Sequence, residues 1–361
     1  MKKSKRILVC PLDWGIGHAT RIVPIINILL ENDFEVVIAA DKRPLSFLKS
    51  EFHNLQFVKF KGYNISYPEK GSMILKMIFS LPKIIFKIIY EHRKLKKIIL
   101  KHQIDIVFSD NRFGLWNKNI PSIFMTHQIM IKTPGNSPYL EKILYKINQS
   151  IIKKYDECWI PDNKEIPNLS GDLSHKFTPP KKSFYIGSLS RFNNKAPIKP
   201  QEKKINILAI ISGPEPQRSI FEEIIISQLK KLNLKSVIVS GMPGNENPKN
   251  KFENLEIFSH LESKKLLEYI LNSKIIICRP GYSSLMDLAA LNKKAIFVPT
   301  PGQTEQEYLA KYLSDRKLFY SVKQKDLDIK KAIEHSDKFS SLSMKNDYSL
   351  LKERIEYWKT N

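Results

Sequence analysis

The chain has 361 residues, of which 42% are hydrophobic, and this is enough for two domains with apolar cores. It carries a net charge of +23, from 59 lysines and arginines against 36 acidic residues. This charge indicates a phosphorylated substrate, an anionic membrane surface or nucleic acid as a partner, unless it reflects a compositional bias, since lysine, isoleucine and asparagine are abundant throughout. Membrane-spanning helices are excluded, because no apolar run approaches the roughly 18 uncharged residues that a span needs.

Three cysteines, Cys10, Cys158 and Cys278, lie far apart, and each falls within an apolar, strand-like run. They are expected to be buried thiols in a reducing cytoplasm, and neither a disulfide set nor a metal site. The basic residues at the start precede only a short apolar run, so this segment is expected to be a first strand and not a signal peptide.

The first half alternates short apolar runs with helical segments, the pattern of a doubly wound α/β domain. The apolar runs predict strands over residues 7–12, 34–40, 55–60, 105–109, 120–125, 158–161 and 183–186. Helices are predicted over 22–30 and 138–155. Ligands of such folds bind at the carboxyl ends of the strands, so the residues that follow each strand are the first candidates for a site.

A glycine turn from Asp13 to Arg21 follows the first strand and contains His18. The turn lacks a full GxGxxG, so it gives little support to a dinucleotide site. Histidine can serve as a general base near neutral pH, although a histidine that caps a helix start is the more common case. On the sequence alone, both roles stay open.

Polar residues also follow two later strands of the same sheet. Asp110 and Arg112 come after the strand at 105–109, and His127 and Gln128 come after the strand at 120–125. These side chains are expected to line one rim, where Asp110 would orient a base or bind an acceptor and Arg112 would pair with an acidic group. Each alone is more often structural than catalytic, so the hypothesis rests on their shared position.

A long helical segment, interrupted by Pro82, is predicted between residues 71 and 101. It is mostly apolar, with lysines on one narrow stripe. These lysines are Lys76, Lys83, Lys87 and Lys94. Two interpretations remain, a helix in an anionic membrane interface and a core-packed helix with a solvated lysine edge.

A polar, proline-containing linker is predicted over residues 190–204, and the α/β rhythm then restarts. Strands are predicted over 205–211, 236–240 and 275–278, a further apolar run over 295–298, a loop over 242–251, and helices up to 229 and over 264–272. Ser212, Gly213 and Arg218 follow the first of these strands, where helix amides and a guanidinium suit a diphosphate. Asp326 and Asp328 are explained better as a helix N-cap than as a metal site.

The strand at 275–278 leads into the richest turn of the second half. Arg279 and Gly281 come first, and a helix follows with Ser283 or Ser284 as its N-cap. Glycine lets a ligand approach the backbone, and the first helical turn favours phosphate. Asp287, one turn further on, can accept hydrogen bonds from ribose hydroxyls. An ordinary strand–turn–helix unit without a ligand explains the same spacing.

Two motifs here resemble the donor-binding segments of GT-B glycosyltransferases, namely RPGYSSLMDLAAL at 279–291 and FVPTPGQ at 297–303. The pattern is most similar to the lipid-acceptor N-acetylglucosaminyltransferases of peptidoglycan synthesis and their uncharacterised bacterial relatives. Gly17-His18 resembles the end of the glycine-rich loop that these enzymes carry after the first strand. The resemblance implies a GT-B architecture, in which two doubly wound Rossmann-like domains face each other across a cleft.

The resemblance also implies a donor site in the second domain. Asp287 would hold the ribose, the Ser212–Arg218 loop would face the diphosphate, and the turn at Leu261 would abut the base through its backbone. The sugar would be held by a polar loop of four residues, Gln303, Glu305, Gln306 and Glu307. The remaining donor-side residues would be Arg279, Gly281, Ser283 and Ser284.

On the acceptor side, the resemblance makes His18 the base that takes the proton of the acceptor hydroxyl, with Asp110 beside it. The other acceptor-side residues would be Asp13, Arg21, Arg112, His127 and Gln128. The predicted domains are 1–190 on the acceptor side and 204–343 on the nucleotide-sugar side, with a last helix in 344–361 that crosses back to the first domain.

The implied reaction is inverting transfer of a sugar from a nucleotide diphosphate, UDP-linked, to a hydroxyl acceptor, without a metal or other cofactor. The acceptor would be lipid-linked or a cell-envelope glycan. The enzyme would be cytoplasmic and peripheral on the inner face of the plasma membrane through the segment at 73–101. Three alternatives stay open: a nucleotide-sugar 2-epimerase on the same fold, a sensor that binds without turnover, and a nucleic-acid-binding protein. Against the last, the positive charge is spread along the chain without an arginine-rich block.

Overall fold

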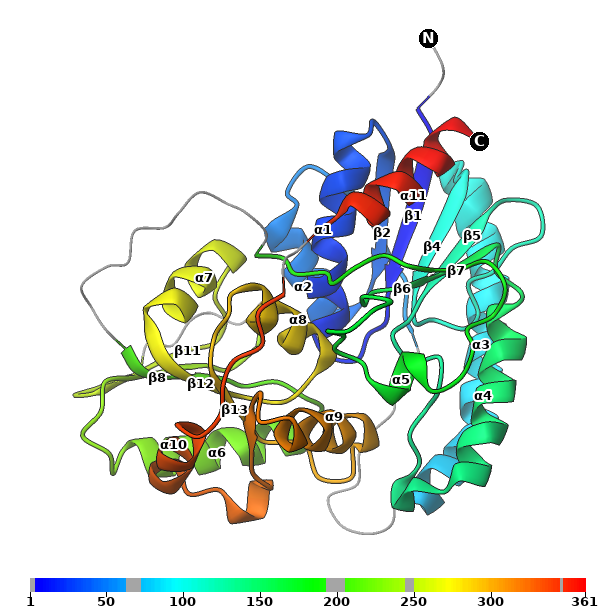
Figure 1. Cartoon of the computed structure of the whole chain (residues 1–361). Helices are drawn as coiled ribbons and strands as arrows, with labels where there is room; N and C mark the ends of the chain where they lie inside the picture. The colour runs from blue at the N-terminus through cyan, green and yellow to red at the C-terminus, as the bar shows by residue number, and fades with distance from the viewer. Residues whose placement is uncertain (1–3, 63–72, 193–204, 244–249, 345–346) are drawn as a thin grey trace.

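Two parallel-stranded sheets form the framework of the chain in a computed structural model (Figure 1). The structure describes residues 4–62, 73–192, 205–243, 250–344 and 347–361. Each sheet has seven strands, the first drawn from the N-terminal half and the second from the C-terminal half. This topology is that of two doubly wound Rossmann-like domains, as predicted.

The first sheet has the strand order β3-β2-β1-β4-β5-β6-β7, and every pairing is parallel. The strands are β1 (Arg6–Pro11), β2 (Glu35–Ala40), β3 (Gln56–Lys59), β4 (Ile106–Asp110), β5 (Ser122–Met125), β6 (Glu157–Ile160) and β7 (Ser183–Tyr185). The order reverses between β1 and β4, so the crevice at the carboxyl ends of these two strands is where such a sheet binds ligands.

The first sheet is covered by α1 (Gly17–Glu31), α2 (Lys42–Glu51), α3 (Met73–His102), α4 (Pro138–Ile152) and α5 (Asp172–His175). The helix α3 differs from the prediction, because it runs without a break through Pro82. Proline removes one backbone hydrogen bond and favours a kink, but a long helix can accommodate it.

The second sheet has the order β10-β11-β9-β8-β12-β13-β14 and reverses between β8 and β12. Its strands are β8 (Ile205–Ile210), β9 (Ser236–Val239), β10 (Asn250–Phe252), β11 (Leu255–Phe258), β12 (Ser273–Cys278), β13 (Ala295–Phe297) and β14 (Tyr320–Ser321). The antiparallel hairpin strand β10 lies at the end of the predicted loop, so that loop prediction is wrong for its last residues.

The helices of the second half are α6 (Gln217–Leu229), α7 (Ser263–Asn272), α8 (Tyr282–Ala290), α9 (Thr304–Asp315), α10 (Ile329–Ser336) and α11 (Ser349–Thr360). The N-cap prediction for α8 is wrong, because Gly281 occupies that position and no side chain caps the helix. The Asp328 N-cap is confirmed, since its carboxylate accepts a hydrogen bond from the Lys331 amide.

The last helix, α11, packs against the first sheet's half of the molecule. Its Arg354 pairs with Glu157 of β6, and the Trp358 indole donates to the same carboxylate at 3.1 Å. Lys5 in turn donates to the Trp358 carbonyl at 3.0 Å. The two ends of the chain therefore lie together on one half of the molecule (Figure 1).

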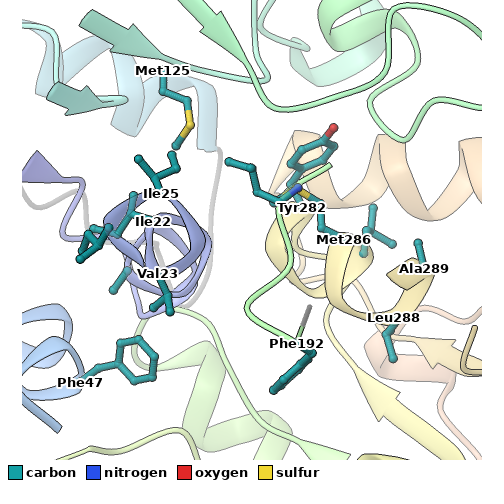
Figure 2. Packing of buried hydrophobic residues seen from close by; sticks show 14 of the residues in the cluster. Ile22, Val23, Ile25, Phe47, Met125, Phe192, Tyr282, Met286, Leu288 and Ala289 are labelled. Atoms are coloured by element: carbon teal, nitrogen blue, oxygen red, sulfur yellow. The ribbon is translucent and has the colours of Figure 1, made fainter. Parts of the chain in front are cut away.

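A single apolar cluster runs through both halves. Figure 2 shows Ile22 and Ile25 of α1 facing Tyr282 and Met286 of α8. The surface where the two halves meet is called the seam below. Within the described part of the chain, no helix has the length and apolar character needed to cross a bilayer. All three cysteines are buried and free, as predicted.

Candidate functional site at the seam

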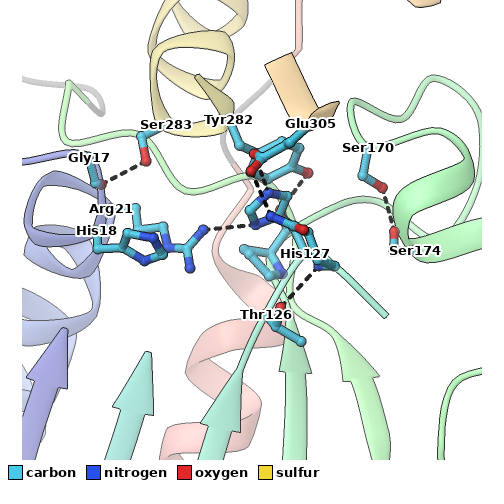
Figure 3. A network of polar contacts seen from close by, with 12 residues as sticks. Gly17, His18, Arg21, Thr126, His127, Ser170, Ser174, Tyr282, Ser283 and Glu305 are labelled. Carbon is cyan, nitrogen blue, oxygen red and sulfur yellow. Dashed lines mark hydrogen bonds and ion pairs between the residues drawn. The ribbon is translucent and has the colours of Figure 1, made fainter. Parts of the chain in front are cut away.

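The seam brings together the switch points of the two sheets. The loop after β1 meets the first turn of α8, where the Ser283 hydroxyl donates to the Gly17 carbonyl at 2.7 Å (Figure 3). A ligand between the domains would therefore contact the acceptor-side loop and the positive end of the α8 dipole together.

His18 and Asp110 form a hydrogen-bonded pair on the acceptor side, with 3.0 Å between Nδ1 and Oδ2. The carboxylate is fully buried and also accepts two hydrogen bonds from Arg21 Nε, at 3.0 and 3.1 Å. Burial alone would raise the pKa of Asp110, but Arg21 and His18 outweigh it and bring the pKa below its usual range.

An ionised carboxylate can only accept hydrogen bonds, so Asp110 requires a proton on His18 Nδ1. Neutral His18 then carries its lone pair on Nε2. The His18 side chain is 15% exposed, whereas Asp110 is inaccessible. This arrangement of an oriented imidazole above a buried carboxylate suits a general base.

His127 continues the polar contacts across the seam (Figure 3). Its Nδ1 lies 2.9 Å from Arg21 Nη1, and its Nε2 lies 2.8 Å from Glu305 Oε1. The Gln128 amide donates to Glu305 Oε2 at 2.6 Å. The predicted acceptor-side residues Arg21, His127 and Gln128 thus meet a residue predicted to hold the donor sugar.

The His127 ring is stacked on Tyr282 of α8, with centroids 4.0 Å apart and planes 7° from parallel. Burial lowers the pKa of His127, and the nearby Arg21 adds to this while Glu305 opposes it. Burial would raise the pKa of Glu305, but His127 brings it below its usual range. The ring is therefore neutral and the Glu305 carboxylate ionised.

The first residues of the predicted linker contact Asp287, the residue predicted to hold the ribose. Asp287 accepts a hydrogen bond from the Ser190 hydroxyl at 2.7 Å, and Arg191 Nε lies 3.4 Å from its other oxygen. Burial raises the pKa of Asp287, an effect that Arg191 partly offsets. Arg191 also packs over the Phe47 and Phe192 rings. Arg191 falls in the predicted linker, and nothing in its spacing indicates that it reaches Asp287.

The loop after β8 holds two residues at the predicted diphosphate position, Ser212 and Gly213, whose φ of 113° favours glycine. Arg218 is placed differently from the prediction. Its guanidinium is bound by Glu215 at 2.5 Å and by Glu222 at 2.7 Å, and Arg43 of the first half also reaches Glu215. In this arrangement the charge of the Arg218 guanidinium is balanced by the two carboxylates, and the guanidinium does not point toward the predicted diphosphate position.

Arg279 lies fully buried below the donor turn. It donates to the Val298 carbonyl at 2.9 Å, the Gln217 carbonyl at 3.1 Å and the Gln324 side chain at 2.6 Å. Burial lowers the pKa of Arg279 to about 9. These contacts tie β12 to α6 and to the loop after β14, so the residue supports the turn from beneath.

The residues of the polar loop in the second half have two roles: some hydrogen-bond within the loop, and one contacts the first domain across the seam. Gln306 accepts a hydrogen bond from the Thr300 amide at 2.8 Å, and Glu307 accepts one from the Gly302 amide at 2.9 Å. Gln303 is the N-cap residue of α9. Of the four predicted sugar contacts, Glu305 is the one that bonds to the first domain. Two other donor-side residues, Leu261 and Ser284, lie in the turn after β11 and in the first turn of α8.

Two predicted acceptor-side residues are engaged within the first domain. Arg112 is buried, pairs with Glu91 of α3 at 2.9 Å and stacks on Phe60. Asp13 accepts a hydrogen bond from the Gly62 amide at 2.7 Å, and burial raises its pKa. Both brace the rim of the sheet. Among the described residues, no group of three histidine, cysteine or acidic side chains is placed to hold a metal.

Comparisons with known proteins address the fold and the enzyme class. Residues 209–353 match the Glycosyltransferase family 28 C-terminal domain. The chain is similar to the UDP-N-acetylglucosamine--N-acetylmuramyl-(pentapeptide) pyrophosphoryl-undecaprenol N-acetylglucosamine transferase of Histophilus somni. The two sequences are 23% identical, and the match covers 92% of this chain and 88% of that protein. The crystal structure of the glycotransferase of kitacinnamycin is similar at a TM-score of 0.61 and 13% identity, over 99% of this chain and 95% of its own.

A putative UDP-N-acetylglucosamine 2-epimerase from Listeria monocytogenes has the same fold, with a TM-score of 0.59 and 12% identity over 99% of this chain and 98% of its own. The fold alone therefore does not separate transferase from epimerase. The match to the family 28 C-terminal domain and the similarity to a transferase over nearly the whole chain distinguish the two activities. They confirm the prediction that the protein is a glycosyltransferase.

Proposed function

We propose that this GT-B glycosyltransferase transfers N-acetylglucosamine from its UDP conjugate to a hydroxyl of a polyprenyl-pyrophosphate-linked sugar. The donor and the acceptor class follow the name of the similar Histophilus somni transferase. The observation that carries the proposal is the His18–Asp110 pair, which lies across the seam from the first turn of α8.

In the proposed reaction, His18 Nε2 takes the proton of the acceptor hydroxyl as its oxygen bonds to the anomeric carbon. The bond from that carbon to the diphosphate oxygen breaks, and its electron pair leaves with UDP. Attack from the face opposite the diphosphate inverts the anomeric configuration. Asp110 stabilises the imidazolium that forms.

Charge on the leaving diphosphate would be stabilised by the first-turn amides of α8, which have no partners within the helix, and by the Ser212–Gly213 loop. This mode of stabilisation uses no metal or cofactor. Ribose binding would require Asp287 to exchange its contacts with Ser190 and Arg191 for the sugar hydroxyls.

A lipid-linked acceptor suits an exposed apolar surface on the first domain. Phe86 of α3 and Tyr139 of α4 are 70% and 74% exposed. Figure 1 shows both helices at the outer edge of that domain. The apolar surface consists of Ile85, Phe86, Ile89, Tyr90, Tyr139, Leu140, Ile143 and Ile147. With exposed lysines such as Lys83, Lys142 and Lys146 on the same helices, it suits the interface of an anionic membrane.

The predicted lysine stripe is only partly presented to solvent. Lys83 is exposed, Lys87 is partly buried with a lowered pKa, and Lys94 packs over Phe60 at 5.4 Å. Lys76 lies outside the residues whose side chains the structure describes. The proposed membrane contact therefore rests on the apolar surface more than on the stripe.

The donor is tested by thermal unfolding with UDP, GDP, CDP, dTDP and a short RNA. A ligand at a hundred times its dissociation constant adds about 2.7 kcal/mol of stability, and we expect this selectively from UDP. UDP release from UDP-N-acetylglucosamine with the lipid-linked acceptor then tests turnover, which His18→Ala should abolish. Stabilisation by RNA and by none of the nucleotides would sink the proposal.

The membrane contact is tested by co-sedimentation with phosphatidylcholine vesicles that contain or lack phosphatidylglycerol. Wild type should pellet with the anionic vesicles, and the double variant Phe86→Ser, Ile89→Ser should lose most of this binding. Leu350→Ser, at an exposed leucine of α11, is the matched control. Equal pelleting of both variants would count against the surface.

A further inference from the structure

A continuous line of polar contacts joins the acceptor-side base to the donor loop. It runs from His18 to Asp110, Arg21, His127 and Glu305, with 2.8 to 3.1 Å between the bonded atoms at each step. Figure 3 shows its second part, from Arg21 through His127 to Glu305. The first four residues belong to the first domain and Glu305 to α9 of the second. Three of the five, Asp110, Arg21 and His127, are at most 2% exposed.

The hydrogen positions along this line follow from chemistry. A guanidinium only donates, so His127 Nδ1 must accept from Arg21 and carry no proton. A carboxylate only accepts, so the His127 proton lies on Nε2 and points to Glu305. One neutral tautomer of His127 satisfies both neighbours, and the stacked Tyr282 ring holds the imidazole plane in place.

We propose that Arg21 and His127 are positioning residues, through which Glu305 of the donor loop fixes the orientation and charge balance of the His18 base. This inference rests on the proposed function. Glu305 fixes the tautomer of His127, which gives Arg21 its second acceptor, and Arg21 then fixes the carboxylate that orients His18. The base is fully assembled when the donor loop is docked on the first domain.

The charged groups around His18 determine in which direction the loss of Glu305 changes the activity profile with pH. Facing it are Asp110 from β4, Arg21 from its own helix, the neutral His127 after β5 and Glu305 from α9. Protonation of His18 adds a positive charge between two carboxylates and one guanidinium. Glu305 is the one carboxylate of this group that comes from the other domain, so its removal disfavours protonation of the base.

The test measures kcat and KM from pH 5.5 to 9 for wild type and Glu305→Gln, with UDP-N-acetylglucosamine and the lipid-linked acceptor. Glutamine keeps the shape and still accepts from His127, but it carries no charge. We expect the acidic limb of the kcat profile to move down by about half a pH unit or more. A carboxylate that only bound the sugar would raise KM and leave this limb in place. Asp315→Asn, at the exposed far end of α9, is the control.

Arg21→Lys tests the bridge, because lysine keeps the charge but cannot hold Asp110 and His127 together. We expect kcat to fall about tenfold or more while stabilisation by UDP is retained. Arg6→Lys, at the opposite end of β1, should change neither. If Arg21→Lys keeps full kcat, Arg21 is not a positioning residue.

NMR of protein with ¹⁵N-labelled histidine tests the proposal without turnover. His127 should show the neutral Nε2–H tautomer at pH 7, and Glu305→Gln should shift the His18 signals while Asp315→Asn does not. A His127 imidazolium, an Nδ1–H tautomer or unchanged His18 signals would overturn the proposal. Absence of wild-type turnover with a normal NMR result would instead refute the proposed substrates.

Discussion

His260 lies in the turn after β11, where the second domain meets the first. Its ring packs edge-on against Phe47 of α2, with centroids 5.9 Å apart. Burial is the main cause that lowers the pKa of His260 to about 4, and the positive charge of Arg191 is the second. The folded chain therefore holds this ring neutral, whereas the unfolded chain would bind a proton near pH 6.5.

We expect acid to destabilise the fold partly through this residue. The unfolded state binds more protons between pH 6.5 and about 4, so the contribution of His260 is full above 6.5 and is lost as the pH falls through that window. At pH 5 the loss should be about 1 kcal/mol, since the ring is partly exposed to solvent. Thermal unfolding at pH 7 and pH 5 should show a smaller decrease for His260→Gln than for wild type. His53→Gln, at an exposed histidine of the first domain, should behave as wild type.

The positions of the site residues along the chain could be predicted, and so could the His18–Asp110 pair, but the other pairings could not. His18 and Asp110 follow strand ends, and parallel strands bring such ends to one edge, so their meeting follows from topology. Arg112 stands at an equivalent position, yet its partner Glu91 comes from the long helix α3. Side-chain direction and buried partners depend on tertiary packing, which the spacing of residues does not encode.

At the scale of elements, one buried carboxylate binds two side chains of α11 to the first domain. Glu157 of β6 accepts hydrogen bonds from the Trp159 indole at 2.7 Å, the Trp358 indole at 3.1 Å and the Arg354 guanidinium. Arg354 also packs over the Phe184 ring at 4.0 Å. A buried carboxylate with three donors is costly to neutralise, because its partners then lose their acceptor.

Glu157→Gln should therefore lower the free energy of unfolding by about 2 to 3 kcal/mol. The matched control is Lys359→Met, also on α11. It removes the exposed pair of Lys359 with Asp33, which follows α1, and should cost less than about 0.5 kcal/mol. Urea unfolding followed by tryptophan fluorescence measures both. Similar losses for the two variants would mean that Glu157 does not anchor α11.

The strands were the most predictable elements, because buried parallel strands are short apolar runs between turn signals. The elements that differ from prediction depend on partners. Ser283 has the side chain of an N-cap, but its hydroxyl bonds to Gly17 of the other domain, and Gly281 begins α8 instead. The hairpin strand β10 has only three residues and pairs with β11 across a tight turn, too short for periodicity to detect.

At the scale of the whole molecule, the two domains are held together by an apolar cluster and by polar contacts around it. Arg43 reaches Glu215 at 3.2 Å, and Glu51 accepts from the Ser263 hydroxyl at 2.7 Å. Two separate apolar patterns in the sequence predict two cores, and nothing in their periodicity shows that they join. The joined cluster stabilises a closed arrangement, in which residues of both domains complete one site.

Gly171 offers a direct test of that closed arrangement. It precedes α5 with a φ of 50°, and a Cβ there would overlap the Tyr308 hydroxyl and lie 2.7 Å from Tyr312 Cε2, both on α9 of the second domain. Gly135 is the control, since its φ is also positive, at 75°, but a Cβ there would meet nothing within 4 Å. Alanine at Gly135 costs about 1 kcal/mol, because a ψ of 6° places it in the left-handed helical region. Alanine at Gly171 costs more, because its ψ is -130°, and it alone obstructs the seam.

We expect Gly171→Ala to separate the domains and Gly135→Ala to leave them closed. Small-angle X-ray scattering should give wild type and Gly135→Ala a radius of gyration near the roughly 21 Å of a compact chain of this length, and a larger value for Gly171→Ala. Turnover should fall only in Gly171→Ala, because Glu305 is then withdrawn from His127. An unchanged radius with lost turnover would place the effect within α5 and its neighbours, whereas an increased radius with full turnover would show that the reaction does not need the closed seam.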